Sequence, residues 1–289
     1  MSAEATDTRL KGSSHSSTAP FWIVHAVCLL AVFTGVHLTD LIVAAVLYAV
    51  GMFAVTAGYH RYFSHRTYKT SRAMQFVLAW LAMQTAQKGV LWWAAHHRHH
   101  HRHSDDEHDV HSVRHKGFWW AHAGWILSDE WSEPDGRRVR DLSKYPELLW
   151  LNRHPMVPPT VLAVAVLALF GWSGLIVGFF WSLVVLWHAT FTINSLSHVF
   201  GTQRYETGDD SRNNPWLALL TFGEGWHNNH HHYQASVRQG FRWYEFDLTY
   251  YVLRAMSWVG LVWDLKQPPR WVVYDEPHPL NVADAAPAE

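Results

Sequence analysis

The sequence predicts an all-α integral membrane protein: four transmembrane helices, paired as two hairpins, would carry a cytoplasmic helical cap that holds a histidine-rich metal site. Three features of the 289-residue chain support this fold class: four apolar runs of near membrane length, 18 Trp with 11 Tyr, and three separate histidine clusters. Trp and Tyr favour the membrane–water interface, because each ring has an apolar body and one polar atom. Clustered imidazoles are typical of a multi-ligand metal site, and this chain has 23 histidines.

The apolar runs set the predicted domain organisation. Each run approaches the roughly 20 residues that a membrane-spanning helix requires, and the short turns between paired runs leave room only for tight hairpins. The first residues are polar and rich in Ser and Thr. We expect a disordered N-terminal segment (1–18), a membrane domain (19–268) with spans near 20–38, 41–59, 156–171 and 175–193, and a loose C-terminal tail (269–289).

The basic residues predict the orientation of these spans. Arg61, Arg66, Lys69 and Arg72 follow the second run directly, whereas the two hairpin turns contain no Lys or Arg. Positive residues stay on the cytoplasmic side of a membrane, so both termini and all three histidine clusters are predicted to be cytoplasmic. Ligands on one side of the membrane can share one metal site.

Segments between and after the spans are expected to form the cap. Residues 73–95 have a helical pattern interrupted by polar residues, which favours a cap or interfacial helix over a partial span. Residues 118–131 contain four Trp and indicate another interface segment. Residues 243–265 mix apolar and charged side chains, which predicts an amphipathic helix against the bilayer, with a fifth span as the alternative.

Composition excludes several other classes. The net charge of −1 gives no electrostatic case for nucleic-acid binding. A mean hydropathy of −0.12 is low for a membrane protein and indicates a large polar part outside the bilayer. The single cysteine, Cys28, excludes a disulfide framework and a cysteine-based metal site.

The histidine spacings point to metal ligation. His60 and His65 stand five residues apart at the predicted end of a span, which is weak by itself. His227, His230 and His231 follow the pattern His-x-x-His-His, which places three imidazoles on one helical face. Neighbours on a helix point about 100° apart, so His230 and His231 could also serve two different metals.

The second cluster allows two registers by spacing alone. Either His96, His99 and His100 or His97, His100 and His101 fit the same pattern, and a solvated polyhistidine stretch is the simplest alternative. The repeated spacing at two distant positions on one predicted membrane face favours a metal site.

These motifs resemble those of the membrane-bound fatty acyl desaturases, most closely the acyl-CoA (stearoyl-type) delta-9 desaturases. The resemblance covers about residues 40–265. It rests on residues 60–65 as a first histidine box, on residues 97–105 as a second box read as His-Arg-x-His-His-x-x-Ser-Asp, and on residues 223–231 as a third box with its preceding loop. The register of the second box selects His97, His100 and His101 over His96, His99 and His103.

The resemblance implies a set of site residues. Residues 194–198, at the end of the fourth predicted span, resemble the family segment that supplies one more histidine and a nearby asparagine. Two iron ions would be bound by His60, His65, His97, His100, His101, His198, His227, His230 and His231, with Asn194 holding a metal-bound water. Apart from the resemblance, Asp105, Asp106, Glu107 and Glu224 could hydrogen-bond ligand imidazoles, because ligand histidines normally need such partners. His188 and Trp93 would line the acyl tunnel, although for His188 a packing role is the alternative.

The resemblance also implies a reaction. A di-iron centre would use O2 and two electrons to place a cis double bond, expected at delta-9, in a long-chain saturated acyl-CoA or acyl-lipid, so the chain is expected to be an oxidoreductase of unsaturated fatty acid biosynthesis. Residues 92–96 lack the charged residues that animal acyl-CoA members carry there, which leaves the acyl donor open. The chain has no fused haem domain, so a separate ferredoxin, rubredoxin or cytochrome b5 type donor with its reductase is expected.

Two alternatives differ in chemistry or class. Another histidine-rich membrane di-iron oxidase, a lipid hydroxylase or acetylenase, would use the same ligands, because the acyl tunnel rather than the irons decides the outcome. A membrane metal transporter would place its ligands in the middle of the bilayer, whereas these lie outside the predicted spans.

Overall fold

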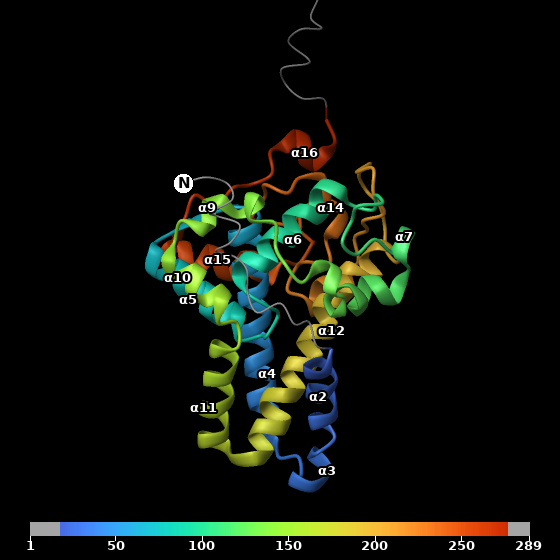
Figure 1. Ribbon diagram of the computed structural model, residues 1–289. Coiled ribbons are helices and arrows are strands. Elements are labelled where there is room, and N and C mark those ends of the chain that lie inside the picture. The colour runs from blue at the N-terminus through green and yellow to red at the C-terminus, as the bar shows by residue number, and fades with distance from the viewer. Residues whose placement is uncertain (1–17, 277–289) are drawn as a thin grey trace, which may run out of the picture.

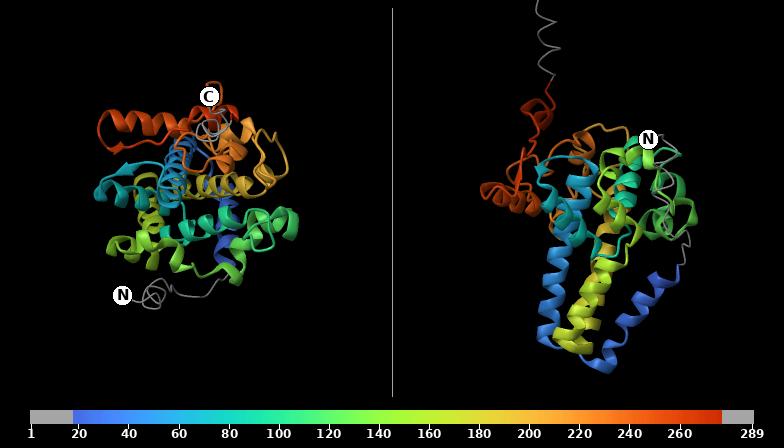
Figure 2. Two further views of the ribbon diagram at one scale, coloured as in Figure 1. Left: turned by 90° about the horizontal axis from the view of Figure 1, so that it is seen from above. Right: turned by 60° about the vertical axis from the view of Figure 1, so that its left-hand side comes forward.

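Apolar helices project together from one side of a body of shorter helices (Figure 1). The computed structural model describes residues 18–276. Figure 2 shows from a second side that the apolar helices all leave the body in the same direction. The body contains α6 and α14, which carry two of the histidine clusters, so these clusters lie at the end of the bundle opposite the hairpin turns (Figure 1).

Two hairpins form the bundle, as the sequence predicts. The first contains α2 (Ala19–Cys28) and α3 (Ala31–Thr34), followed by α4 (Leu38–Phe53), which continues without a break into the π-helix η1 (Ala54–Ser64). The second contains α11 (Val157–Ser173), then η5 (Gly174–Trp181) and α12 (Ser182–Asn194). The second helical run is longer than the predicted 41–59, because the π-helix extends it into the body.

Local sequence explains where the hairpins turn. Gly35 has φ of 77° and ends α3, while the His37 N–H donates to Asp40 Oδ2 (3.2 Å) and caps the start of α4. Gly171 has φ of 70° and kinks α11 near its end, three residues before η5 begins. Two stretches, Leu38–Ser64 and Val157–His198, are long and apolar enough to cross a membrane by length and composition.

The body is built from short elements around the inner ends of the long helices. Between the two hairpins lie α5 (Arg72–Met83), α6 (Val90–His103), α7 (Val113–Lys116), η2 (Trp120–Gly124), α8 (Trp125–Leu127), η3 (Asp129–Trp131), η4 (Gly136–Val139), α9 (Arg140–Ser143) and α10 (Pro146–Arg153). After the second hairpin come η6 (Leu196–His198), α13 (Pro215–Leu220), α14 (His227–His232), α15 (Leu248–Trp258) and α16 (Arg270–Tyr274).

The structure corrects three expectations about the cap. Residues 73–95 are not one helix, because positive φ angles at Ala86 and Lys88 separate α5 from α6. The predicted helix over 243–265 is shorter: Asp247 caps its start, and Gly260 (φ 73°) lies just after its end. Part of the tail, residues 270–274, forms α16, while residues 277–289 and 1–17 lie outside the described part of the chain.

The fold also contains one element that an all-α prediction omits. Strands β1 (Lys69–Thr70) and β2 (Val262–Trp263) pair antiparallel, with Lys69 opposite Trp263. This short ladder fastens the segment after α15 beside the chain that leaves η1. The main core packs η1, α5 and α6 together and includes Tyr59, Leu78 and Leu91, so the inner end of the first hairpin is firmly held in the body.

Candidate metal centre

Nine histidines from four segments face one another in two adjacent groups. The first group, the five-histidine position, contains His60, His65, His97, His101 and His230. The second, the four-histidine position, contains His100, His198, His227 and His231. Within each group, one ring nitrogen of every histidine lies within 4.8 Å of those of the others. These are the nine histidines proposed as ligands from the sequence; that they bind metal remains a prediction.

Neighbouring nitrogens within the groups lie at ligand-like separations. In the five-histidine position the Nε2–Nε2 distances are 3.0 Å for His60–His230, 2.8 Å for His65–His97 and 2.9 Å for His101–His230. In the four-histidine position His198 and His227 approach to 3.1 Å. Two nitrogens that bind one ion at about 2.1 Å and at right angles are roughly 3.0 Å apart. The spacing therefore fits a shared metal ion in each position.

Helical periodicity divides each His-x-x-His-His cluster between the two positions. On α6, His97 and His101 are four residues apart and face the five-histidine position, while His100 faces the other. On α14 the division is reversed: His227 and His231 share the four-histidine position and His230 faces away from them. This division agrees with the expectation that neighbouring histidines serve different metals.

The π-helix explains the five-residue spacing of the first cluster. The His65 N–H donates to the His60 carbonyl oxygen (3.2 Å), a hydrogen bond between residues i and i+5. A π-helix closes its turns at this spacing, so the two rings come to one side, with centroids 4.9 Å apart. In an ordinary α-helix, residues five apart would not share a face.

Buried carboxylates contact the Nδ1 atoms of four of these histidines. His198 Nδ1 donates to Asp105 Oδ2 (2.7 Å), and His60 Nδ1 contacts Glu224 Oε2. Both acidic residues were named from the sequence. His100 Nδ1 donates to Asp109 (2.9 Å), and His231 Nδ1 donates to Asp209 (2.6 Å).

Asp109 and Asp209 are not among the residues that the sequence motifs predict. Asp109 stands at the end of the acidic run that follows the second cluster, which was a usable signal. Asp209 lies in a loop without a motif, and only the tertiary structure brings it to His231. Asp106 and Glu107 in the same acidic run instead pair with His103 and His108, outside both groups.

The contacts direct the free nitrogens toward the proposed ions. A carboxylate only accepts hydrogen bonds, so Nδ1 carries the proton and Nε2 carries the lone pair. His100 Nε2 and His231 Nε2 are buried and have no hydrogen-bond partner among residues 18–276. Unpartnered buried nitrogens are uncommon in proteins, and a metal ion would satisfy both. The donor set therefore fits a metal at each position.

The protonation state of the rings also suits metal binding. Burial, with repulsion between neighbouring imidazoles, holds the pKa of His65, His97, His101, His227 and His230 well below the ordinary value. Burial lowers the pKa of His231 to about 4, despite its bond to Asp209. Burial opposes ionisation of Asp105, but its hydrogen bond with His198 lowers its pKa to about 2. At neutral pH these six rings are therefore neutral and Asp105 is ionised, which are the forms that metal binding requires.

The histidines that the register left out have other partners. His96 Nδ1 contacts the Trp92 carbonyl (2.8 Å), and His99 Nε2 contacts the His108 carbonyl (2.8 Å). His103 pairs with Asp106 (2.9 Å). Of the two registers that spacing alone allows, His97, His100 and His101 lie in the histidine groups, whereas His96 and His99 lie outside them.

The other three proposed site residues have different surroundings. Asn194 is the last residue of α12, is partly buried, and belongs to neither histidine group. Trp93 stacks on His97 (centroids 4.9 Å apart), so it lies directly beside the five-histidine position. His188 links His25 and His122 through contacts of 3.0 Å at its two ring nitrogens.

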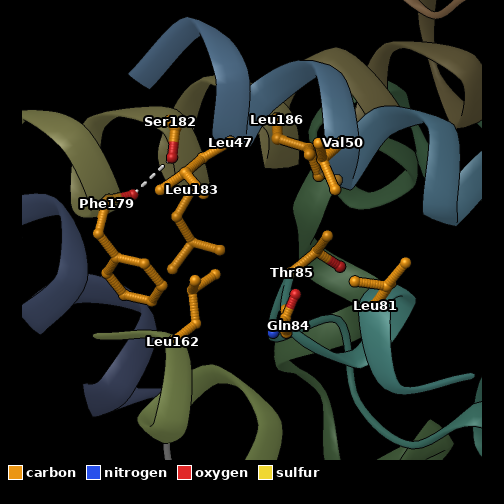
Figure 3. Close-up of a pocket in the computed structure, with 11 residues that line it drawn as sticks. Leu47, Val50, Leu81, Gln84, Thr85, Leu162, Phe179, Ser182, Leu183 and Leu186 are labelled. Carbon is orange, nitrogen blue, oxygen red and sulfur yellow. Dashed lines mark hydrogen bonds between the residues drawn. The ribbon is translucent and has the colours of Figure 1, made fainter. Parts of the chain in front are cut away.

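An apolar pocket lies between the long helices and α5 (Figure 3). Leu47 and Val50 of α4, Leu81 of α5, Leu162 of α11 and Leu183 of α12 line it, and neither His188 nor Trp93 belongs to the lining. The hydrogen bonds of His188 fit the packing role that was the alternative to a place in the tunnel.

The fold and the site define a helical protein built around a histidine-rich candidate metal centre at one end of an apolar bundle. A sequence profile for fatty acid desaturase matches residues 36–263, which is most of the chain. The chain belongs to the fatty acid desaturase family and is an oxidoreductase, which confirms the resemblance seen in its histidine boxes.

Several characterised proteins are similar over most of their length. The chain is 36% identical over 275 residues to the sn-1 stearoyl-lipid 9-desaturase of Synechocystis sp., which covers 90% of this chain and 85% of the relative. It is 38% identical over 226 residues to the protein of the same name from Anabaena variabilis, covering 78% and 83%. It is also 36% identical over 244 residues to the hex-5-enoyl-[acyl-carrier protein] acetylenase of Moorena producens, covering 77% and 75%.

Proposed function

We propose that this protein is an O2-dependent membrane desaturase that introduces a cis double bond at the delta-9 position of a long-chain saturated acyl group. One observation carries the proposal: nine histidines gather into two adjacent positions in a chain whose relatives include two stearoyl-lipid 9-desaturases. These relatives favour an acyl-lipid over an acyl-CoA as the substrate.

We propose two iron ions as the metals, one in each histidine position. Bound there with O2, a pair of irons supplies the oxidising power needed to remove hydrogen from an unactivated methylene. The overall reaction consumes O2, two electrons and two protons and yields the alkene and two waters. The buried carboxylates orient the ligand rings, and Asn194 would hold a metal-bound water beside His198, four residues further on.

We propose that both hairpins span the membrane, with the body, the histidine positions and the termini on the cytoplasmic side. Large apolar side chains of the hairpins are exposed, among them Trp22, Phe33, Leu169 and Trp172. Contiguous exposed apolar surface of this kind suits contact with lipid chains. The basic residues that follow the second span support the orientation.

The acyl chain is proposed to enter the apolar pocket of Figure 3. Gly51 lines this pocket, and His60 follows it on the same continuous helix, η1 being the extension of α4. A chain bound along this helix would have its far end among apolar side chains and its middle beside the histidines. Trp93, against His97, would border the reacting carbons.

A separate one-electron carrier of the ferredoxin, rubredoxin or cytochrome b5 type, with its reductase, is proposed as the electron source. A surface pocket lined by Ser64, His65, Arg98, His101, Gln234 and Ala235 opens at the five-histidine position. It brings two proposed ligands within reach of a docked partner.

A second candidate function is acetylenase activity, because one relative bears that name at 36% identity. The two reactions share their ligands and differ in whether the bound acyl chain already holds a double bond at the reacting carbons. Product analysis separates them.

The proposal is tested by expressing the chain, with a competent electron donor, in a host that lacks unsaturated fatty acids. Mass spectrometry of total lipid is expected to show monounsaturated chains with the double bond at position 9. Saturated lipid alone, from a protein that holds two irons, would refute the desaturase assignment. A triple bond from an unsaturated feed would establish the acetylenase instead.

Two variants on α6 test the assignment of ligands in the same assay. His101→Ala is expected to abolish the new double bond and to lower bound iron, because it removes a ligand of the five-histidine position. His99→Ala is the matched control, since it lies on the same helix but contacts the His108 carbonyl. Activity lost in the control and kept in His101→Ala would show that the register is wrong.

A further inference from the structure

The two histidine positions differ in the charge placed behind their ligands. Three of the four ligands of the four-histidine position contact an aspartate through Nδ1: His100 with Asp109, His198 with Asp105 and His231 with Asp209. All three carboxylates are buried, so water screens their charge weakly.

The five-histidine position has a single carboxylate in contact with its ligands, and a buried arginine partly offsets the charge of that carboxylate. Glu224 contacts His60, but its other oxygen accepts hydrogen bonds from Arg61 Nε (3.2 Å) and Nη2 (3.0 Å). Asp247 also pairs with Arg61 and contacts no histidine. Among the described residues, no carboxylate contacts His65, His97, His101 or His230.

Gln239 and Arg98 also lie beside the five-histidine position. The Gln239 amide lies 3.2 Å from His60 Nδ1 and 3.5 Å from His230 Nδ1. Arg98 lines the surface pocket together with His65 and His101, and Asp141 pairs with it (2.7 Å). With one contacting carboxylate against three, the first position is less negative than the second.

Ligand charge influences the oxidation state of a bound metal. A carboxylate that accepts the Nδ1 proton makes the imidazole a stronger donor, and buried negative charge stabilises the more highly charged ion. Three such carboxylates favour the oxidised ion at the four-histidine position. The single, partly offset carboxylate at the five-histidine position makes the reduced ion more favourable there than at the other position.

Burial points in the same direction. All four histidines of the second position are buried, whereas His65, His97 and His101 of the first are partly exposed. The surface pocket also reaches the first position. An electron from a docked carrier therefore has its shortest path to the ion that the charges make easier to reduce.

We propose that the protein makes its two metal positions electrically unequal, so that an iron in the five-histidine position is reduced before the iron in the four-histidine position. The inference rests on the proposed di-iron function and deepens it. Each iron gains one electron from a one-electron reductant, and the half-reduced protein holds the ferrous ion in the five-histidine position.

The test is an anaerobic titration of the iron-loaded protein with dithionite, followed by Mössbauer spectroscopy, without acyl substrate. Two separate reduction steps are expected, with a half-reduced state that contains one ferrous and one ferric ion. Reduction of both irons in one step would overturn the proposal. This measurement uses the unaltered protein, so it does not depend on any variant folding.

Two variants assign the steps to the positions. Asp209→Asn removes one charge behind the four-histidine position and is expected to shift the second reduction equilibrium about tenfold toward the ferrous ion, which is about 59 mV for one electron. Glu224→Gln should alter the first step only. An effect of Asp209→Asn confined to the first step would overturn the assignment.

The outcome is independent of the lipid assay. A protein with two distinct reduction steps that makes no double bond would refute the desaturase proposal and retain this one. A protein that makes double bonds while both irons are reduced in one step would refute this proposal and retain the desaturase proposal.

Discussion

At the residue scale, the candidate metal centre is supported by a buried arginine that pairs with two buried carboxylates. Arg61 is fully buried, and its guanidinium bonds Glu224, Asp247 and the Val237 carbonyl. Through Glu224 it reaches His60, so it positions a proposed ligand without touching the metal position itself. Leaving either carboxylate unpaired in the interior would be costly.

Arg61→Met is therefore expected to destabilise the protein by roughly 3–5 kcal/mol, because two buried carboxylates lose their cation. Denaturant unfolding in detergent measures the change. Arg72→Met is the matched control: Arg72 also pairs with a glutamate, Glu147, but lies at the surface, so little change is expected. Equal losses in both variants would contradict the buried-charge argument.

At the element scale, the short helix α14 owes its place to a close backbone approach. A Cβ on Gly225 would lie 2.0 Å from the Ala218 nitrogen and 2.5 Å from the Asn214 carbonyl oxygen. Only glycine fits there, two residues before His227 begins the helix. The packing of α13 against this glycine thus sets the position of three proposed ligands.

Gly225→Ala should lower the iron content of the purified protein several-fold, because α14 must move to relieve a backbone clash. Gly124→Ala is the control, since its nearest contact, the Trp120 ring, is 3.3 Å away and can adjust. Iron is measured by elemental analysis against protein concentration. Full iron occupancy in Gly225→Ala would show that α14 tolerates the shift.

At the scale of the whole molecule, the proposed orientation can be tested with one introduced cysteine at a time, because the chain has only one native cysteine to replace. In a Cys28→Ser background, Trp172→Cys places a thiol in the exposed hairpin turn and Arg140→Cys places one on the exposed surface of the body. A membrane-impermeant maleimide should label the first in intact cells and the second only after permeabilisation. The reverse pattern would invert the topology.

The stability of the metal-free protein should fall as the pH falls below about 6.5, the ordinary pKa of histidine. The folded state holds the pKa of His65, His97 and His101 well below that value through burial, so the unfolded chain binds more protons. Each such histidine lowers the free energy of unfolding by about 1.4 kcal/mol per pH unit.

His100 and Asp105 also bear on the direction in which stability changes with pH. Burial disfavours the charged form of His100, but Asp109 raises its pKa, so this residue opposes the trend. Asp105, with a pKa of about 2, stays ionised throughout and adds nothing above pH 5. The thermal midpoint of chelator-treated protein, measured from about pH 7.5 to 5.5, should fall; a flat or rising midpoint would contradict the shifts.

The sequence by itself determined the features that depend on local periodicity. The four apolar runs fall on helices of the bundle, and the nine histidines predicted as ligands gather into two groups, while their binding of metal remains a prediction. These features could be predicted because helical spacing and hydrophobic run length are properties of neighbouring residues. The first hairpin turns at residues 35–37, before the predicted turn at residues 39–40, because α4 already includes Asp40. Asp105 and Glu224 could be named because each lies beside a histidine box.

Only the tertiary structure decided how those residues combine. It divides the histidines into groups of five and four, brings Asp209 to His231, uses a π-helix to align His60 with His65, and links His188 to His25 and His122. Each of these depends on contacts between distant segments or on a departure from the α-helical repeat. The inequality of charge between the two positions follows from the same contacts, because the packing of the body decides which carboxylate lies behind which imidazole.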